Sequence, residues 1–283
     1  ALKAALLPLY LWLPAAYAHT SAPVAALFAI MTKVGAYSIL RVYSLIAGES
    51  AGPLAGLLDA WLVPAALATL AFGMAGALAS TSLRQQAAYL VVASIGTLLV
   101  AFGLGSPEAL AAGLYYLPHS TFAAAALFLL ADSIARARGE FEDRFESGPA
   151  MPRARLLGGL FFVAALAIAG LPPLSGFLAK FILLRAALDA PLMPWVWGVV
   201  LATGLLGVIA LARSGSLLFY RTHTPHVELA APGNAALAPV AGLLALVAGL
   251  MLAAGPLSDF AAATAAQLTA PQHYIDAVLG GAR

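Results

Sequence analysis

Every lysine of the chain falls within a long apolar stretch of the sequence. Lys3, Lys33 and Lys180 are flanked by hydrophobic residues, and His119 lies in a further stretch of this kind. A charged lysine at the centre of a lipid bilayer costs at least about 2.5–3.5 kcal/mol, but lysine, unlike arginine, can lose its proton when it is desolvated. Lysine and histidine that alternate between charged and neutral forms can pass protons along short water chains. The four residues therefore predict a proton relay through the middle of a membrane.

Two of these residues have a simpler alternative interpretation. Lys3 lies near one end of its apolar stretch, so its ammonium could extend to the lipid headgroups. His119 could be hydrogen-bonded within a helix bundle without exchanging protons. The simpler interpretation is weaker for Lys33, near the centre of its stretch, and for Lys180, which follows a helix-breaking sequence.

The composition places these residues in a membrane protein. Of the 283 residues, 63% are hydrophobic and only 9% are charged, whereas soluble domains average about 45–50% and about 25%. A soluble globule of this size could not bury so much apolar surface, which excludes a cytosolic enzyme. The net charge of +2 is small and the basic residues are scattered, which argues against nucleic acid as a partner.

The sequence also argues against cofactor and metal chemistry. The chain has no cysteine, which excludes disulfides and thiolate-ligated metal centres. It has no phosphate-binding glycine loop and no histidine cluster with metal-ligand spacing. The pair His223 and His226 is interpreted as part of a solvated loop. We therefore expect no cofactor and no metal site.

Apolar runs bounded by charges or turn-forming residues predict an all-α, polytopic membrane helix bundle. About 20 residues cross the hydrocarbon, so 283 residues leave room for roughly eight spans. Pro8 and Pro14 interrupt the first span, which is only partial, and the tail 256–283 is expected to form an interfacial helix. The predicted spans cover residues 1–17, 23–47, 60–80, 87–105, 107–136, 155–188, 194–213 and 235–255.

Two predicted spans are longer than one straight helix needs, and each contains a central helix breaker. The first breaker surrounds Pro118 and the second is 169–176, with the sequence AGLPPLSG. Proline removes a backbone donor and clashes with the preceding turn, and in lipid the freed carbonyls need another partner. We expect discontinuous helices at both places, although Pro118 could make only a packing kink. Beside the second break we expect a hydrated pocket, near Ser175 and Lys180, that opens to the outside.

The distribution of arginines predicts the orientation. Segment 136–155 carries five of them and is expected to be cytoplasmic. Threading the spans from this segment places eight arginines inside and three outside, and it places the C-terminus outside. The other inside arginines are Arg84, Arg213 and Arg221, and the outside ones are Arg41, Arg185 and Arg283.

Four segments resemble those of a known family. They are 3–14 (KAALLPLYLWLP), 32–41 (TKVGAYSILR), 116–130 (YLPHSTFAAAALFLL) and 169–181 (AGLPPLSGFLAKF). Together they are similar to the proton-translocating core of antiporter-like membrane subunits. These subunits occur in Mrp-type (Pha-type) multisubunit cation/proton antiporters and in respiratory complex I, and the details favour the D-type subunits of Mrp/Pha antiporters. The resemblance covers about residues 1–215.

The resemblance implies a role for each of the four residues. Lys3 matches the lysine of a first broken helix, which pairs with a glutamate on an earlier helix. Lys33 matches a central connecting lysine, His119 a relay histidine, and Lys180 the terminal lysine of a second broken helix. Family members have about fourteen spans in two inverted five-helix repeats, and this chain would hold the second repeat. Because the helices with the partner glutamate are absent, we expect a C-terminal fragment of such a protein.

Two positions depart from some members of the family. Certain complex I subunits have another histidine where this chain has Ser94, and some have a glutamate where it has Lys180.

The expected function is that of a proton-translocating membrane subunit of a multisubunit Na⁺ or K⁺/H⁺ antiporter, and not that of an enzyme. Its expected partners are the other subunits, the bilayer of the cell membrane, protons and the cation. The antiporter-like unit is expected over 1–215, and a cytoplasmic loop, a closing helix and a tail over 216–283. A proton-pumping subunit of an NADH–quinone oxidoreductase is the first alternative. A scaffold subunit is the second, and the lysines within the spans argue against it.

Overall fold

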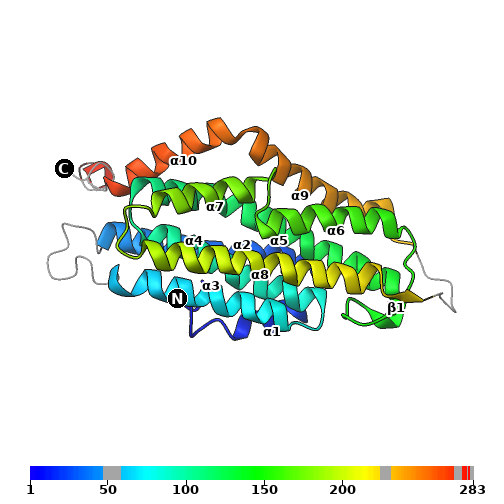
Figure 1. Ribbon diagram of the computed structural model, residues 1–283. Coiled ribbons are helices and arrows are strands. Elements are labelled where there is room, and N and C mark those ends of the chain that lie inside the picture. The colour runs from blue at the N-terminus through cyan, green and yellow to red at the C-terminus, as the bar shows by residue number, and fades with distance from the viewer. Residues whose placement is uncertain (47–58, 224–230, 271–275, 279, 281–283) are drawn as a thin grey trace.

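The computed structural model describes residues 1–46, 59–223, 231–270, 276–278 and 280, and this part of the chain is almost entirely helical. The main helices lie side by side along one common direction (Figure 1). Of the residues singled out from the sequence, His226 and Arg283 lie outside the described part. The elements are α1 (Trp12–Ala18), α2 (Ala22–Ile46), α3 (Asp59–Ala79), α4 (Leu83–Gly103), α5 (Pro107–Arg138), the 3-10 helix η2 (Gly139–Phe141), β1 (Gly148–Pro149), α6 (Ala154–Ala169), α7 (Ser175–Ala186), α8 (Met193–Phe219), β2 (Thr222–His223), α9 (Asn234–Leu252) and α10 (Ala254–Thr269).

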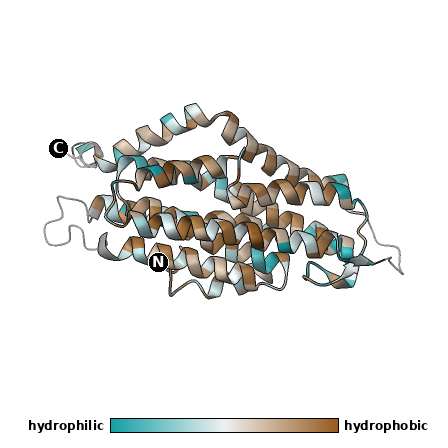
Figure 2. Ribbon diagram, viewed as in Figure 1, coloured by the Kyte–Doolittle hydropathy of each residue, from teal (hydrophilic) through white to brown (hydrophobic). Residues whose placement is uncertain are grey.

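Six helices of the described part are long and apolar enough to cross a membrane, namely α2, α3, α4, α5, α8 and α9. Hydrophobic residues cover most of their length, and hydrophilic residues gather toward the ends of the bundle (Figure 2). The bounds of these six helices follow the predicted spans closely, except that α4 begins at Leu83 instead of near residue 87, and α8 continues to Phe219 instead of ending near residue 213. The prediction of an all-α, polytopic membrane bundle is confirmed.

Helices α4 and α5 form the centre of the bundle. Of the six candidate spans, α4 is the most buried, and it packs against α1, α3 and α5, while α5 also contacts α2, α6, α7, α9 and α10. Glycines allow α3 and α4 to approach closely. A Cβ atom on Gly96 would lie 2.5 Å from the backbone nitrogen of Leu70, and one on Gly73 would lie 2.6 Å from that of Ala93. Small residues at such contacts are typical of membrane helix packing.

The predicted span 155–188 consists of two helices, α6 and α7, which lie roughly end to end (Figure 1). Gly170 ends α6 in the left-handed conformation, with φ of +74°. The amide of Leu171 then donates to the carbonyl of Leu166 at 3.0 Å, which is a common glycine-dependent helix end. The two prolines that follow supply no amide donors. The expected discontinuous helix is therefore confirmed at this place.

The expected discontinuity at Pro118 is wrong, because α5 continues through this residue without a break. Proline cannot donate to the carbonyl of the preceding turn, here that of Leu114, and the helix tolerates this loss without unwinding. Two hydroxyls bond to a different carbonyl nearby. Ser120 and Thr121 donate to the carbonyl of Leu117 at 3.1 and 2.9 Å. Side-chain bonds of this kind bend helices slightly and do not end them. His119 therefore lies on a continuous helix.

The two terminal regions were only partly predicted. Residues 2–11 form turns, and Pro14 falls in the first turn of α1, where proline is tolerated, so it does not interrupt the helix. The expected tail helix is present as α10. It packs on α5 and extends along the bundle rather than across one end of it (Figure 1). Its position at a membrane interface remains a prediction.

One end of the bundle gathers arginines that the sequence places on one side. Arg84 and Arg136 both pair with Asp132, at 2.9 and 2.7 Å. Arg213 donates to the carbonyl of Leu78 near the end of α3, at 2.8 Å. The parallel pair β1–β2 joins two loops at this end. The structure thus brings these arginines together, as the alternation of the predicted spans requires.

The loop after α5 is held by two buried polar side chains. The carboxylate of Asp143 accepts a hydrogen bond from the backbone amide of Arg84 at 2.6 Å, at the N-terminus of α4, where negative charge is favourable. Burial nevertheless raises the pKa of Asp143, and this hydrogen bond only partly opposes the effect. The guanidinium of Arg138 donates at 2.6–3.0 Å to three loop carbonyls, those of Glu142, Arg144 and Glu146.

Candidate functional site

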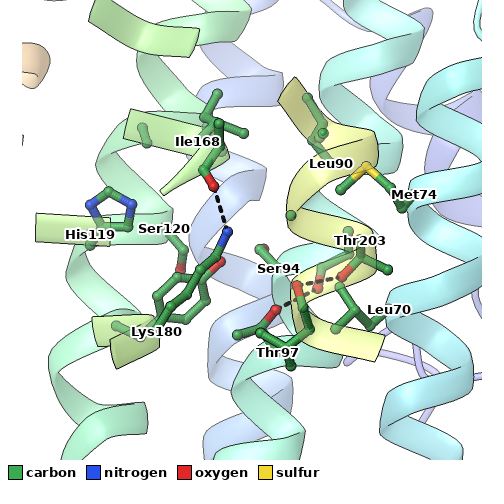
Figure 3. A pocket seen from close by; sticks show the side chains of 18 of the residues that line it. Leu70, Met74, Leu90, Ser94, Thr97, His119, Ser120, Ile168, Lys180 and Thr203 are labelled. Atoms are coloured by element: carbon green, nitrogen blue, oxygen red, sulfur yellow. Dashed lines mark hydrogen bonds between the residues drawn. The ribbon is translucent and has the colours of Figure 1, made fainter. Parts of the chain in front are cut away.

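A small cavity with polar side chains among its mainly apolar lining lies near the mid-length of α4 and α5. Its volume is about 40 Å³, which is room for about three water molecules. Helices α3, α4, α5, α6, α7 and α8 contribute to its wall. The polar side chains that line it are Ser94, Thr97, Tyr116, His119, Ser120, Lys180 and Thr203. Figure 3 shows Lys180, His119 and Ser120 on one side of the cavity and Ser94, Thr97 and Thr203 on the other.

Lys33 is connected to this cavity through Ser94. The Lys33 side chain on α2 is 1% exposed, and its ammonium donates to the hydroxyl of Ser94 on α4 at 3.1 Å. Ser94 also donates to the carbonyl of Val91 at 2.7 Å. Lys33 does not line the cavity itself, whereas Ser94 does. The hydroxyl therefore joins the buried lysine to the space that His119 and Lys180 share.

Lys180 forms a hydrogen bond with a backbone carbonyl that the helix break leaves without a partner. Its ammonium donates to the carbonyl of Ala169, the last residue of α6, at 2.9 Å. A carbonyl at a helix end has no partner within its helix, so the lysine satisfies a group that Gly170 and the two prolines leave open. A Cβ atom on Gly170 would lie 2.8 Å from the Lys180 nitrogen. The glycine thus permits the turn and also makes room for the ammonium.

His119 is buried between α5, the start of α7 and α9. Its Nδ1 lies 2.8 Å from the hydroxyl of Ser175, and that hydroxyl donates to the carbonyl of Val247 at 3.0 Å. Because a serine hydroxyl has a single hydrogen, this network makes His119 Nδ1 the donor. In this assignment of the tautomer, Nε2 of the neutral ring carries no hydrogen and can accept a proton.

A backbone carbonyl beside Nε2 of His119 can accept a hydrogen bond when the ring is protonated. A Cβ atom on Gly176 would lie 2.5 Å from Nε2 and 2.7 Å from the carbonyl of Ala167, so the ring and this carbonyl meet over the glycine. Once protonated, Nε2 could donate to the Ala167 carbonyl while Nδ1 donates to Ser175. Protonation therefore gives His119 a hydrogen bond at Nε2 that this neutral form lacks, which favours uptake of a proton.

Lys3 is not part of this constellation. Its side chain is exposed, and it forms no hydrogen bond or ion pair with any other described residue. The backbone of residues 3 and 4 nevertheless packs on α2, because a Cβ atom on Gly35 would lie 2.6 Å from the nitrogen of Ala4 and 2.8 Å from the carbonyl carbon of Lys3. The structure brings His119 and Lys180 to one cavity, connects Lys33 to it through Ser94, and leaves Lys3 outside it.

Several contributors to the site were not recognised from the sequence. Ser175 was expected beside the pocket, but it is buried, it does not line the cavity and it holds His119 instead. Thr97 and Thr203 line the cavity without a motif around them. Across the described residues, no group of three or more His, Asp or Glu side chains could hold a metal ion.

The fold and the site define a class, a multi-pass α-helical membrane protein with titratable side chains around an internal polar cavity. Within this class, the family model described as "NADH:quinone oxidoreductase/Mrp antiporter, TM" matches residues 1–209, and the chain belongs to this family.

Its relatives include D subunits of antiporters. The chain is 39% identical to the D subunit of a probable K⁺/H⁺ antiporter of Rhizobium meliloti, with 99% of this chain and 57% of the relative covered. It is 34% identical to the D subunit of the Na⁺/H⁺ antiporter of Alkalihalophilus pseudofirmus, with 99% and 56% covered. The predicted resemblance to the D-type subunits is confirmed. The chain spans 56–57% of the length of these two relatives.

Solved structures show the same fold. A chain of the Mrp complex from Dietzia sp. DQ12-45-1b superposes with a TM-score of 0.84 at 28% identity, with 99% of this chain and 59% of that chain covered. A chain of respiratory complex I from Thermus thermophilus superposes with a TM-score of 0.73 at 23% identity, with 95% and 56% covered. The second similarity shows a common fold alone.

Proposed function

We propose that this chain forms the proton-conducting half of a D subunit in a multisubunit Na⁺/H⁺ or K⁺/H⁺ antiporter. The observation that carries the proposal is the hydrogen bond from Lys33 to Ser94, since Ser94 lines the cavity that also contains His119 and Lys180. A proton moves from Lys33 through the Ser94 hydroxyl and cavity water to His119 or Lys180. The cavity is large enough for the few waters that this path needs.

Electrostatic repulsion couples the protonation states of His119 and Lys180. Two protonated groups that face the same small cavity repel each other strongly, because there is little water to screen them. Arrival of a proton at Lys180 or His119 therefore favours the neutral form of the other group. Arginine could not take the place of Lys33, because the guanidinium does not release its proton.

The break between α6 and α7 makes Lys180 the exchange point at one end of the relay. Its ammonium holds the Ala169 carbonyl, so loss of the proton leaves the lysine with two remaining donors, while the carbonyl can bond to water.

Lys3, whose backbone packs on Gly35 of α2, is proposed to pair with a carboxylate on another segment of the protein.

We further propose that the helices form the second of two inverted repeats, with the antiporter-like unit over 1–215 and a loop, closing helix and tail over 216–283. Residues 136–155 face the cytoplasm and the C-terminus faces outside. The clustering of Arg84, Arg136 and Arg213 at one end of the bundle supports this orientation.

We propose that the partners are the other subunits of the antiporter complex. The same position in an NADH–quinone oxidoreductase is disfavoured, because the relatives at 34–39% identity are antiporter subunits.

Transport in everted vesicles tests the proposal. The protein is expressed within its complex in cells that lack their own antiporters, and cation-dependent proton release is followed with a pH-sensitive dye. His119→Ala and Lys180→Ala are expected to reduce exchange at least ten-fold with normal amounts of assembled complex. Ser133→Ala is a matched control, because Ser133 is a buried hydroxyl on α5 that bonds to its own helix and does not line the cavity. Normal exchange with both substitutions would contradict the relay.

A further inference from the structure

A long apolar groove lies on the outer surface of the bundle between α6 and α8. Its volume is about 610 Å³, within the range of about 300–1,000 Å³ that is typical of sites for small organic ligands. The groove is hollow because its floor carries small residues. Gly158, Ala165, Ala212 and Gly215 contribute to it, and Phe161 and Phe219 form part of its walls.

The groove extends from one end of the bundle to the middle. Its lining begins at Arg155, in the first turn of α6, and reaches Ala169 and Leu171 at the helix break. At 1.5 Å per residue, the fourteen steps from Arg155 to Ala169 correspond to about 21 Å. One leaflet contributes about 15 Å of hydrocarbon. The groove therefore has the length of an acyl chain whose headgroup lies at the membrane surface.

The polar groups of the groove lie at that same surface end. Arg155 is exposed and forms no hydrogen bond or ion pair with any other described residue. The hydroxyl-bearing residues Ser216 and Tyr220 line the groove beside it, and Tyr220 is 85% exposed. Tyrosine is enriched at the headgroup level of membranes, and basic pockets between membrane helices bind anionic headgroups. A cation of this kind beside two hydroxyls fits a phosphate diester.

We propose that this groove is a binding site for an anionic glycerophospholipid, with its phosphate at Arg155 and one acyl chain along α6 and α8 as far as the break. The length of the groove matches one extended acyl chain, and the cation at its surface end matches an anionic headgroup. The binding does not depend on the proposed transport function.

The inner end of the groove touches the proton-relay site. Ala169 lines both the groove and the polar cavity, and its carbonyl is the group that holds Lys180. The end of the acyl chain therefore covers the unwound turn on its lipid side, where it keeps the freed backbone away from bulk water. This arrangement gives the lipid a means to influence the geometry around Lys180.

Photolabelling of the assembled complex in lipid nanodiscs tests the proposal. The probes are phosphatidylglycerol and phosphatidylcholine with the same acyl chains, each with a diazirine near the chain end, and the labelled residues are mapped by mass spectrometry. We expect phosphatidylglycerol to label residues of α6 and α8 around Ala169 and Val208 about five-fold more than phosphatidylcholine, as one basic residue near an anionic headgroup implies. Arg155→Ala should abolish this preference.

Matched variants distinguish labelling within the groove from labelling elsewhere on the lipid-facing surface. Ala212→Trp should fill the groove and suppress labelling by both lipids, whereas Ala202→Trp, at an exposed position of α8 outside the groove, should not. Arg185→Ala, an exposed arginine in the last turn of α7, should leave the preference intact. Equal labelling by the two lipids, an unchanged preference in Arg155→Ala, or a side chain of a neighbouring subunit seated in the groove would overturn the proposal.

Discussion

Ser94 on α4 accepts a hydrogen bond from the ammonium of Lys33 on α2, at 3.1 Å, and is the residue through which that buried lysine reaches the central cavity. The two residues are 61 positions apart in the sequence. A hydroxyl can accept a proton from one side while it donates to the other. Ser94 can therefore pass protons between Lys33 and cavity water when its hydrogen turns from the Val91 carbonyl to that water.

Ser94→Ala is expected to slow transport more than it affects assembly. A hydrogen bond to a charged group contributes about 1.5–3 kcal/mol, so its loss at the transfer step corresponds to about 10- to 100-fold in rate. Ser94→Thr keeps the hydroxyl and should retain most of the activity. The measurement is cation-dependent proton exchange in everted vesicles at several pH values. Equal rates for the alanine variant and the unmodified protein would exclude Ser94 from the path.

Gly176→Ala is expected to disable His119. A Cβ atom at this position would lie 2.5 Å from Nε2 of the histidine and 2.7 Å from the Ala167 carbonyl, so the ring must move away from Ser175. We expect at least a ten-fold loss of exchange and a destabilisation of about 1–3 kcal/mol, as is common for overpacked sites. Gly198→Ala is the control, because a Cβ atom there meets nothing within 4 Å. If the two variants transport equally well, the position of His119 is not critical.

Much of the fold could be predicted from the sequence because the membrane imposes a simple rule. A helix that crosses lipid needs a continuous apolar run, and arginines at its ends mark the boundary, as at Arg84 and Arg136. The break after α6 was also predictable, since Gly170 and the two prolines after it exclude a helix for local reasons. Pro118 was misjudged because a single proline can either kink or break a helix, and the local sequence does not decide between the two, whereas α5 is continuous and packs on most of the other helices.

The titratable residues of the site could be identified from the sequence, but their hydrogen-bond partners could not. Lys33, His119 and Lys180 stand out because titratable groups are costly in lipid. Their partners do not stand out, because Ser94 and Ser175 are common residues in membrane helices. The bonds from Lys33 to Ser94 and from His119 to Ser175 join positions 61 and 56 residues apart. Such pairs arise from the packing of whole helices, which a single sequence does not reveal.

The orientation predicts which positions are accessible from each side. The sequence has no cysteine, so an introduced cysteine is the single one among these residues, and labelling of the unmodified complex gives the background. Ser147→Cys, in the loop after α5, should react with a membrane-impermeant maleimide only in everted vesicles. Asp189→Cys, after α7, should react only in right-side-out vesicles. Both positions are exposed. The reverse pattern would show that residues 136–155 face outward.

Asp143 is expected to stabilise the start of α4 chiefly by accepting the hydrogen bond from Arg84. Because burial raises its pKa, its contribution to stability falls as pH rises from the unfolded value of about 3.9 through the raised pKa. Asp143→Asn keeps an acceptor for the Arg84 amide and removes this pH dependence. Asp143→Ala removes the acceptor at a cost of about 1 kcal/mol.

Hydrogen exchange of amides 83–86 in the assembled complex distinguishes these two variants of Asp143. We expect protection in Asp143→Asn to equal or exceed that of the unmodified protein at neutral pH, and protection in Asp143→Ala to fall about five-fold, as that loss of about 1 kcal/mol implies. If the asparagine variant loses as much protection as the alanine variant, the negative charge itself is needed.

The most direct test of the relay is transport by proteins altered at Lys33. Lys33→Ala removes the proton carrier, and Lys33→Arg keeps the charge but cannot release the proton. Both should abolish cation-dependent proton exchange in everted vesicles while the complex assembles in normal amounts. Thr32→Ala, at the neighbouring buried position of α2, should retain exchange. Near-normal exchange with Lys33→Ala would contradict the account.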